Sequence, residues 1–145
     1  MAAELMKGLE KVAKLARLLG RSFDLKSAYR QLAVSDDSLK WARLAVFCPE
    51  DRATHCFQKY SLPFGAKASV VAFLRCDKMI QWIAHVLDIV TSCYFDDYVC
   101  LTPEPLASST NKAFSALLDL LGWRHDGSGE KSDSMSSEVS ALGVV

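Results

Sequence analysis

The stretch Cys93-Tyr94-Phe95-Asp96-Asp97-Tyr98-Val99 places two adjacent carboxylates inside an apolar run that extends from Val86 to Leu101. Such a run is typical of a buried strand, and a buried carboxylate without a partner is costly in free energy. Two adjacent carboxylates also raise each other's pKa and resist joint ionisation. Because hard carboxylate oxygens are ligands that suit Mg²⁺, the stretch predicts half of a metal site that other segments complete.

The plain alternative for Asp96-Asp97 is an acidic hairpin turn. Two-residue hairpin turns favour Asn-Gly or Asp-Gly, because the turn needs positive φ. Asp-Asp with aromatic residues on both sides is a poor sequence for such a turn. The metal site is therefore the favoured interpretation, with Val90–Tyr94 and Tyr98–Leu101 expected as two strands joined at Asp96-Asp97.

Hydrophobic periodicity and turn residues predict alternating strands and helices elsewhere. The expected elements are a helix over 3–19 ended by Gly20, a strand over Ser22–Leu25, a helical turn over Lys26–Leu32, a hairpin of Trp41–Phe47 and Thr54–Tyr60, a helix over Ala66–Val86, a helix over Leu106–Leu121 ended by Gly122, and a strand over Val139–Val145. This order favours an α+β fold, in which an antiparallel sheet has its helices packed on one face.

Composition limits the class of protein. The 145 residues suffice for one domain with its own core, and the formal net charge of zero argues mildly against a nucleic-acid partner. The five cysteines form no C-x-x-C pair and have no histidine at ligand spacing, which argues against a zinc site. Without a secretory signal they favour reduced thiols in an intracellular protein, nuclear or cytoplasmic. No apolar run reaches transmembrane length, so we expect no membrane partner.

Asp24 is the candidate for a second metal-binding carboxylate. Taken alone, an Asp at a strand end before a helical turn is most often a helix N-cap. If its strand lies beside the Asp96 hairpin, however, Asp24 and Asp96 can share two metal ions roughly 3.5–4 Å apart. Such a pair activates an attacking oxygen and stabilises the leaving oxygen in phosphoryl transfer.

The segment Leu62-Pro63-Phe64-Gly65-Ala66-Lys67-Ala68-Ser69 is the third candidate. It is either a plain loop that enters a helix or a place where the Gly65 backbone approaches a ligand closely. In the second case the amides at the helix N-terminus would face an anionic phosphate. The residues alone leave the two interpretations equal.

Taken together, these segments resemble the palm motifs of reverse transcriptases. Residues 23–32 (Phe-Asp-Leu-Lys-Ser-Ala-Tyr-Arg-Gln-Leu) are similar to the first motif, 62–69 to the second, and 94–97 to the third, in the family's order and spacing. Gly122-Trp123 with Lys131 beyond resembles the fourth motif, and residues 141–143 (Ala-Leu-Gly) resemble the primer grip. The residues of the first two motifs most resemble those of LTR-type or DIRS-like retroelements. The resemblance implies a polymerase palm with a ferredoxin- or RRM-like core.

The resemblance also implies a metal site of four residues, Asp24, Leu25, Asp96 and Asp97, of which the three aspartates are catalytic. Asp24 and Asp96 would bind two Mg²⁺ ions, with Mn²⁺ as an alternative, and the Leu25 carbonyl would help to hold one of them. Asp97 would support the site as a third catalytic carboxylate. The implied reaction is RNA-directed DNA polymerisation, in which dNTPs are added to the primer 3′-OH on an RNA or DNA template.

The remaining implied roles concern the nucleotide and the primer. Tyr29 falls where the family has an aromatic gate that excludes the ribose 2′-hydroxyl, and Phe64 and Gly65 would line the nucleotide pocket. Lys131 would protonate the departing pyrophosphate. Leu142 and Gly143 would belong to the primer grip.

Two departures from the family pattern concern the flanks of the palm. Family members have a fingers subdomain with basic residues before the first motif and a thumb after the last. Here we expect residues 1–21 to form one amphipathic helix in place of most of the fingers, and residues 22–145 to form a palm without a thumb. The favoured hypothesis is a truncated retroelement fragment that needs the missing segments or a polyprotein context. The alternatives are an inactive relic and a non-enzymatic α+β binding module, including one whose acidic cluster binds a structural cation.

Overall fold

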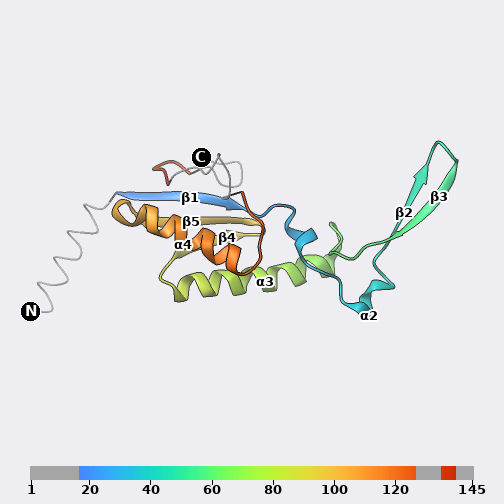
Figure 1. Cartoon of the computed structure of the whole chain (residues 1–145), viewed down its shortest axis with the longest axis horizontal. Helices are drawn as coiled ribbons and strands as arrows, with labels where there is room; N and C mark the ends of the chain where they lie inside the picture. The colour runs from blue at the N-terminus through green and yellow to red at the C-terminus, as the bar shows by residue number, and fades with distance from the viewer. Residues whose placement is uncertain (1–16, 127–134, 140–145) are drawn as a thin grey trace, which may run out of the picture.

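A computed structural model describes residues 17–126 and 135–139 of the chain (Figure 1). Its elements follow one another as β1 (Leu18–Asp24), the 3₁₀ helix η1 (Ala28–Gln31), α2 (Asp36–Leu39), β2 (Arg43–Cys48), β3 (Ala53–Gln58), α3 (Lys67–Val86), β4 (Val90–Tyr94), β5 (Asp97–Pro103), the 3₁₀ helix η2 (Glu104–Leu106) and α4 (Ala107–Leu120). This order of strands and helices confirms the predicted α+β class. Among the described residues, no helix combines the length and the hydrophobicity that a membrane crossing needs.

The central sheet has three antiparallel strands in the order β1-β5-β4. The pairing of β1 with β5 ends at Asp24 opposite Asp97, and the pairing of β4 with β5 ends at Tyr94 opposite the same Asp97. On the outer side of β1, Gly20 and Ser136 exchange two backbone hydrogen bonds of 2.7 and 2.8 Å. The register therefore brings the end of β1 next to the turn between β4 and β5.

Both long helices pack on the same face of this sheet. Tyr98 of β5 contacts α4 through the Phe114 ring, with ring centroids 5.5 Å apart, and contacts α3 through a hydrogen bond to Asp77. Phe23 of β1 meets Phe114 edge-on at 4.9 Å. The largest fully buried hydrophobic side chains are those of Phe23, Leu25, Phe73, Ile80, Tyr98, Phe114 and Leu118. The prediction that helices cover one face of an antiparallel sheet is thus confirmed.

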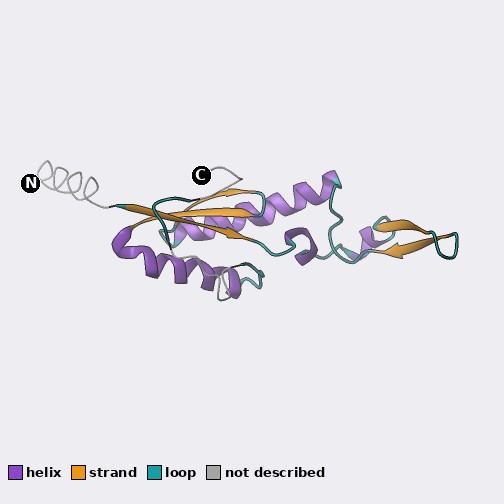
Figure 2. Ribbon diagram, turned by 90° about the horizontal axis from the view of Figure 1, so that it is seen from above, coloured by secondary structure: helices purple, strands orange, loops and turns teal. Residues whose placement is uncertain are grey.

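Strands β2 and β3 form a separate hairpin that projects from this body as an arm (Figures 1 and 2). The predicted hairpin is confirmed, although every residue in it except Cys48 is exposed. A two-stranded hairpin with no covered face is marginal in water. Its base is fastened by backbone hydrogen bonds from Val34 to Tyr60 and from Leu62 to Leu32, each 2.9 Å. The arm is therefore joined to the body close to the Leu62–Ser69 segment.

The start of β1 corrects the predicted N-terminal helix. The sequence predicted a helix that includes Leu19 and ends at Gly20, but the strand already begins at Leu18. Pairing with β5 overrides the helical periodicity here. Gly20 has a packing role instead, because a Cβ on it would lie 2.6 Å from Val139 Cγ2 and 2.9 Å from Leu101 Cδ2.

Several predictions fall on residues outside the described ranges. They concern the helix over residues 3–16, the strand after Val139, and the site residues Lys131, Leu142 and Gly143. The division of the chain at residues 21 and 22 stays a prediction as well, although that boundary falls inside β1.

Candidate active site

The hairpin between β4 and β5 turns at Phe95 and Asp96, and not at Asp96-Asp97 as predicted. Asp97 is already the first residue of β5. Phe95 has a φ of 55°, at the position that glycine usually fills when a two-residue turn needs positive φ. Such strain in a bulky residue persists only where the surrounding structure imposes it. Here the Tyr94 ring packs edge-on against Phe95 at 4.9 Å, and the Cys93 sulfur lies 3.1 Å from the Phe95 carbonyl oxygen.

The three predicted carboxylates lie together at this end of the sheet. Asp24 ends β1 directly opposite Asp97, so both residues project from the same face of the paired strands. The Leu25 N–H donates to the Asp96 carbonyl at 3.1 Å and ties the turn to the end of β1. The Ser22 hydroxyl donates to Asp97 Oδ1 at 3.2 Å. Sheet register and two hydrogen bonds therefore position the acidic cluster.

The concentration of negative charge shifts the titration of Asp24. Partial burial raises the pKa of Asp24, and the charges of Asp96, Asp97 and Asp126 raise it further, against a lowering by the Leu25 backbone hydrogen bond. The nearby Lys26 ammonium pairs with Asp126 at 3.2 Å. A divalent cation would relieve this repulsion.

Carboxylate oxygens fit a hard divalent cation, although the oxygens of Asp24, Asp96 and Asp97 do not all lie as close together as the ligands of one ion. Within residues 17–126 and 135–139, the group of three candidate ligand atoms that all lie within 4.8 Å of one another is Cys48, Asp51 and His55 in the arm. The palm carboxylates are therefore more widely spaced than that group. Like charges in a partly buried site repel one another, and the cation itself would draw them together.

A cavity of about 400 Å³ opens beside the turn, and three of the predicted nucleotide residues, Tyr29, Phe64 and Gly65, are in its lining. Its lining consists of Tyr29, Phe64, Gly65, Val70, Tyr94, Phe95, Asp96 and Asp97. The Tyr29 ring stacks on Phe73 with centroids 4.8 Å apart and meets Phe64 edge-on at 5.7 Å. Burial and the charge of Asp96 raise the pKa of the Tyr29 hydroxyl. Two of the carboxylates thus share one cavity with Tyr29, Phe64 and Gly65.

A second cavity of about 350 Å³ adjoins the first and has two basic residues in its lining. Arg30 and Lys59 line it together with Tyr29, Phe64 and Asp96, which also line the first cavity. The sequence analysis gave neither basic residue a role. Arg30 could have been singled out because it follows Tyr29 directly, whereas Lys59 reaches the site only through the return strand of the arm.

Gln31 and Asp126 are two further residues that the sequence analysis missed. The Gln31 amide donates to the carbonyls of Lys26 and Arg124, both at 2.9 Å, and accepts from the Arg124 N–H at 2.7 Å. The Asp126 N–H donates to the Asp24 carbonyl at 3.0 Å. The segment around residue 125 is thereby fastened along the end of β1. Gln31 lies inside the first motif, but no pattern in the sequence predicts that Asp126 lies next to Asp24.

Comparison with known families gives a match that spans almost the whole chain. The family model described as "Reverse transcriptase (RNA-dependent DNA polymerase)" matches residues 6–145. The matched span includes the acidic cluster, the residues that line both cavities, and the undescribed positions 131, 142 and 143. A search of curated proteins found no match.

Proposed function

The chain belongs to the reverse transcriptase family, and on that premise we propose that it is a palm that performs two-metal nucleotidyl transfer. The family implies RNA-directed DNA polymerase chemistry with divalent metals, a nucleic-acid template and dNTP substrates. The observation that carries the proposal is the register of the sheet, which sets Asp24 opposite Asp97 and beside Asp96. These carboxylates adjoin a cavity of about 400 Å³, of a size suited to a small ligand.

The metal end of the site depends on residues that the sheet holds in place. Asp24 and Asp96 would hold two Mg²⁺ ions with help from the Leu25 carbonyl, and the bound ions would polarise the α-phosphate and the primer 3′-oxygen. Asp97 receives the Ser22 hydroxyl at 3.2 Å and is thereby oriented. In phosphoryl transfer the protein contributes chiefly positioning and electrostatic stabilisation. Here the adjacent ends of β1 and β5 hold the carboxylates in position.

The nucleotide end of the site follows from the two cavities. The Tyr29 ring, stacked on Phe73, would lie under the sugar and leave no room for a 2′-hydroxyl. Arg30 and Lys59 line the adjoining cavity and would attract the triphosphate, because cationic side chains stabilise phosphoryl oxygens. The site would therefore hold a dNTP with its sugar on Tyr29 and its phosphates between the carboxylate-bound ions and these two cations.

Primer extension by the whole chain tests this proposal. Purified protein is given a primed RNA template, dNTPs and either Mg²⁺ or Mn²⁺, next to the variant Asp96→Asn. Asp37→Asn, a change to an exposed acid in α2 that lines neither cavity, serves as the matched control. We expect extension by the wild type and by Asp37→Asn, and a loss of roughly 10³-fold in Asp96→Asn. A wild type that extends no better than Asp96→Asn would refute the enzymatic proposal.

A metal titration separates the inactive alternatives from one another. Mg²⁺ that raises the melting temperature of the wild type and not of Asp96→Asn would indicate an assembled site. With no extension, that result would favour a relic that retains its metal centre or a module whose acidic cluster binds a structural cation. No shift in either protein would favour the metal-free binding module.

We further propose that this palm derives from an LTR-type or DIRS-like retroelement and acts inside the cell, together with fingers and thumb segments of a polyprotein. The support is the resemblance of its motifs and the exposed apolar surface of the arm, where Phe47 is 60% and Phe57 55% exposed. Exposed patches of this kind are typical of interaction sites. A neighbouring reading frame with fingers or thumb motifs would support this origin, and interrupting stop codons would count against it.

A further inference from the structure

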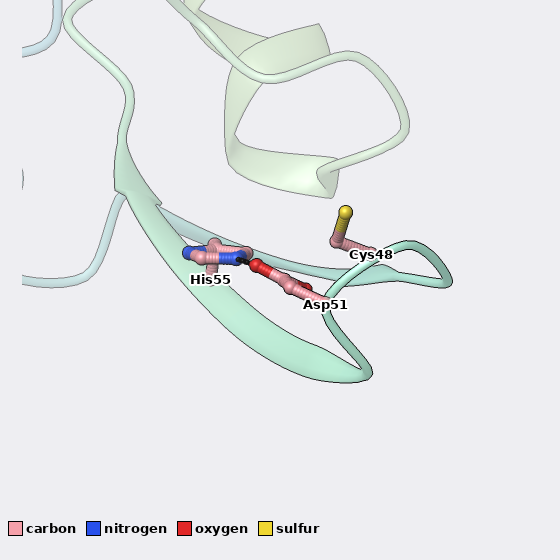
Figure 3. Close-up of side chains that lie close together, drawn as sticks. All are labelled: Cys48, Asp51 and His55. Carbon is pink, nitrogen blue, oxygen red and sulfur yellow. Dashed lines mark hydrogen bonds and ion pairs between the residues drawn. The ribbon is translucent and has the colours of Figure 1, made fainter.

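The tip of the arm carries a second group of metal-ligand side chains, far from the palm carboxylates (Figures 1 and 3). One ligand atom each from Cys48, Asp51 and His55 lies within 4.8 Å of the other two. The spacing of the cysteines and histidines along the chain indicates no zinc site. The hairpin brings Cys48 and His55 together across its turn, which no C-x-x-C or His spacing would reveal.

The strand register explains why these residues meet. Cys48 lies opposite Ala53, and His55 lies two residues further along β3, opposite Val46. Opposed residues and residues two apart share one face of a ribbon, so Cys48 and His55 occupy the same face as diagonal neighbours. Asp51 lies in the connecting turn between them. The three side chains thus come from both strands and the loop at a single end of the hairpin.

Asp51 is held in place by contacts on both carboxylate oxygens. Its Oδ1 accepts the Ala53 N–H at 3.0 Å, and its Oδ2 is 2.6 Å from His55 Nε2 (Figure 3). These two contacts orient the carboxylate toward the imidazole at the end of the hairpin.

We propose that Cys48, Asp51 and His55 form a binding site for Zn²⁺ or a similar transition-metal ion. Thiolate, carboxylate and imidazole are the three ligand types that zinc combines. One thiolate and one carboxylate balance the charge of a divalent ion, and the thiolate selects against Mg²⁺. Ligand atoms around tetrahedral zinc lie roughly 3.2–3.8 Å apart. The group, already within 4.8 Å, needs only small side-chain rotations, with water in the fourth position.

Metal at this site would stabilise the arm itself. All of β3 and all of β2 except Cys48 are exposed, so buried apolar area contributes little to hold the hairpin together. An ion bound to both strands and the turn would link the two strands at the turn end of the hairpin, and its binding free energy would become folding free energy of the hairpin. The chain continues from β3 to Lys59 and Phe64, which line the second cavity. The arm is therefore connected directly to residues of the nucleotide site.

Titration of the whole, metal-stripped chain with Co²⁺ alone tests the site. Tetrahedrally bound Co²⁺ absorbs visible light. A thiolate ligand adds a charge-transfer band to the spectrum, which Co²⁺ bound to the palm carboxylates cannot give. We expect this band to saturate at one equivalent and to vanish when Zn²⁺ is added. Cys48→Ser should abolish the band, and His55→Gln should weaken binding at least roughly tenfold. A second readout is alkylation by iodoacetamide, mapped by mass spectrometry, in which Zn²⁺ should protect Cys48.

Cys56 provides the matched control. It is an exposed cysteine of the same hairpin, but it lies next to His55 on β3 and so faces the opposite side of the ribbon. Cys56→Ser should keep the Co²⁺ band, and Zn²⁺ should leave the alkylation of Cys56 unchanged. A band that survives Cys48→Ser, a band that is lost equally in Cys56→Ser, or no thiolate band at micromolar Co²⁺ would overturn the proposal. Circular dichroism of the variants should match the wild type, because the altered side chains lie in an exposed arm.

Discussion

Tyr98 donates a hydrogen bond from its hydroxyl to the buried carboxylate of Asp77. The Cys93 thiol donates to the same carboxylate oxygen at 2.7 Å. Since Cys93 lies on β4 and Tyr98 on β5, one side chain of α3 holds both strands of the hairpin that carries Asp96 and Asp97. Burial first, and then the hydrogen bond to Asp77, raises the pKa of both Tyr98 and Cys93. Both groups therefore remain protonated donors at neutral pH.

Tyr98→Phe is expected to lower the free energy of unfolding by about 1.5–3 kcal/mol, the usual contribution of a hydrogen bond to a charged group. The ring keeps its packing against Phe114, so the loss isolates the hydroxyl. Urea denaturation measures it. Tyr94→Phe is the control, because Tyr94 is 59% exposed and its hydroxyl should matter by less than about 0.5 kcal/mol. Equal effects of the two changes would show that the Asp77 contact contributes no special stability.

Asp77 also illustrates what the sequence could not supply. Periodicity predicted α3 and the strands around the acidic pair, because those signals are local and repeated. It assigned no buried role to a carboxylate in the helix, since its two partners lie on other elements. The same limit hid Asp126 and Lys59, which reach the site through long-range contacts. By contrast, the meeting of Asp24 with Asp96 and Asp97 was expected on the condition that the strand of Asp24 lies beside the Asp96 hairpin, and from the resemblance of the motifs to a polymerase palm.

Asp24→Asn is expected to stabilise the metal-free protein near neutral pH while it abolishes any primer extension. The raised pKa of Asp24 means that the folded state binds this proton more tightly than the unfolded chain does. Stability therefore falls as the pH rises from the ordinary pKa of 3.8 through the raised value, and the cost is fully present above it. Because the side chain is exposed and screened by water, the gain should not exceed about 1 kcal/mol.

The measurement is urea denaturation in EDTA at a series of pH values. Below pH 3.8 the carboxyl is protonated in both states, so wild type and Asp24→Asn should converge there. Added Mg²⁺ should stabilise the wild type at neutral pH and leave the variant unchanged. A variant that is less stable than the wild type at neutral pH without metal would contradict the view that the cluster is under repulsion.

Tyr29→Ala is expected to reduce the preference for dNTPs over ribonucleotides by roughly 10- to 100-fold. The Tyr29 ring is fixed by stacking on Phe73, so its removal opens space at the floor of the cavity. Tyr29→Phe keeps the ring and should keep the preference. The ratio of kcat/KM for the two kinds of nucleotide measures the effect. If Tyr29→Ala discriminated as well as Tyr29→Phe, the ring would not be the group that excludes the 2′-hydroxyl.

The turn between β4 and β5 was predicted one residue out of place for a physical reason. The sequence-based expectation joined the two strands at Asp96-Asp97, although Asp-Asp between aromatic residues is a poor sequence for a two-residue turn. The structure instead assigns positive φ to Phe95, because Asp97 is needed as the strand residue opposite Asp24. The preference of a two-residue turn for glycine is overridden here by the strand register that brings the carboxylates together. Such exceptions are common at functional sites.

Gly20→Ala is expected to lower the free energy of unfolding by about 1–3 kcal/mol, as overpacking does. The added Cβ would lie 2.6 Å from Val139 Cγ2 and 2.9 Å from Leu101 Cδ2. The stiff, β-branched Val139 must move away, which strains the bridge between Gly20 and Ser136. A double-mutant cycle with Val139→Ala tests the cause: the cost of Gly20→Ala should fall by at least about 0.5 kcal/mol once the Val139 methyl is gone. Strict additivity of the two changes would instead place the cost in the backbone of β1.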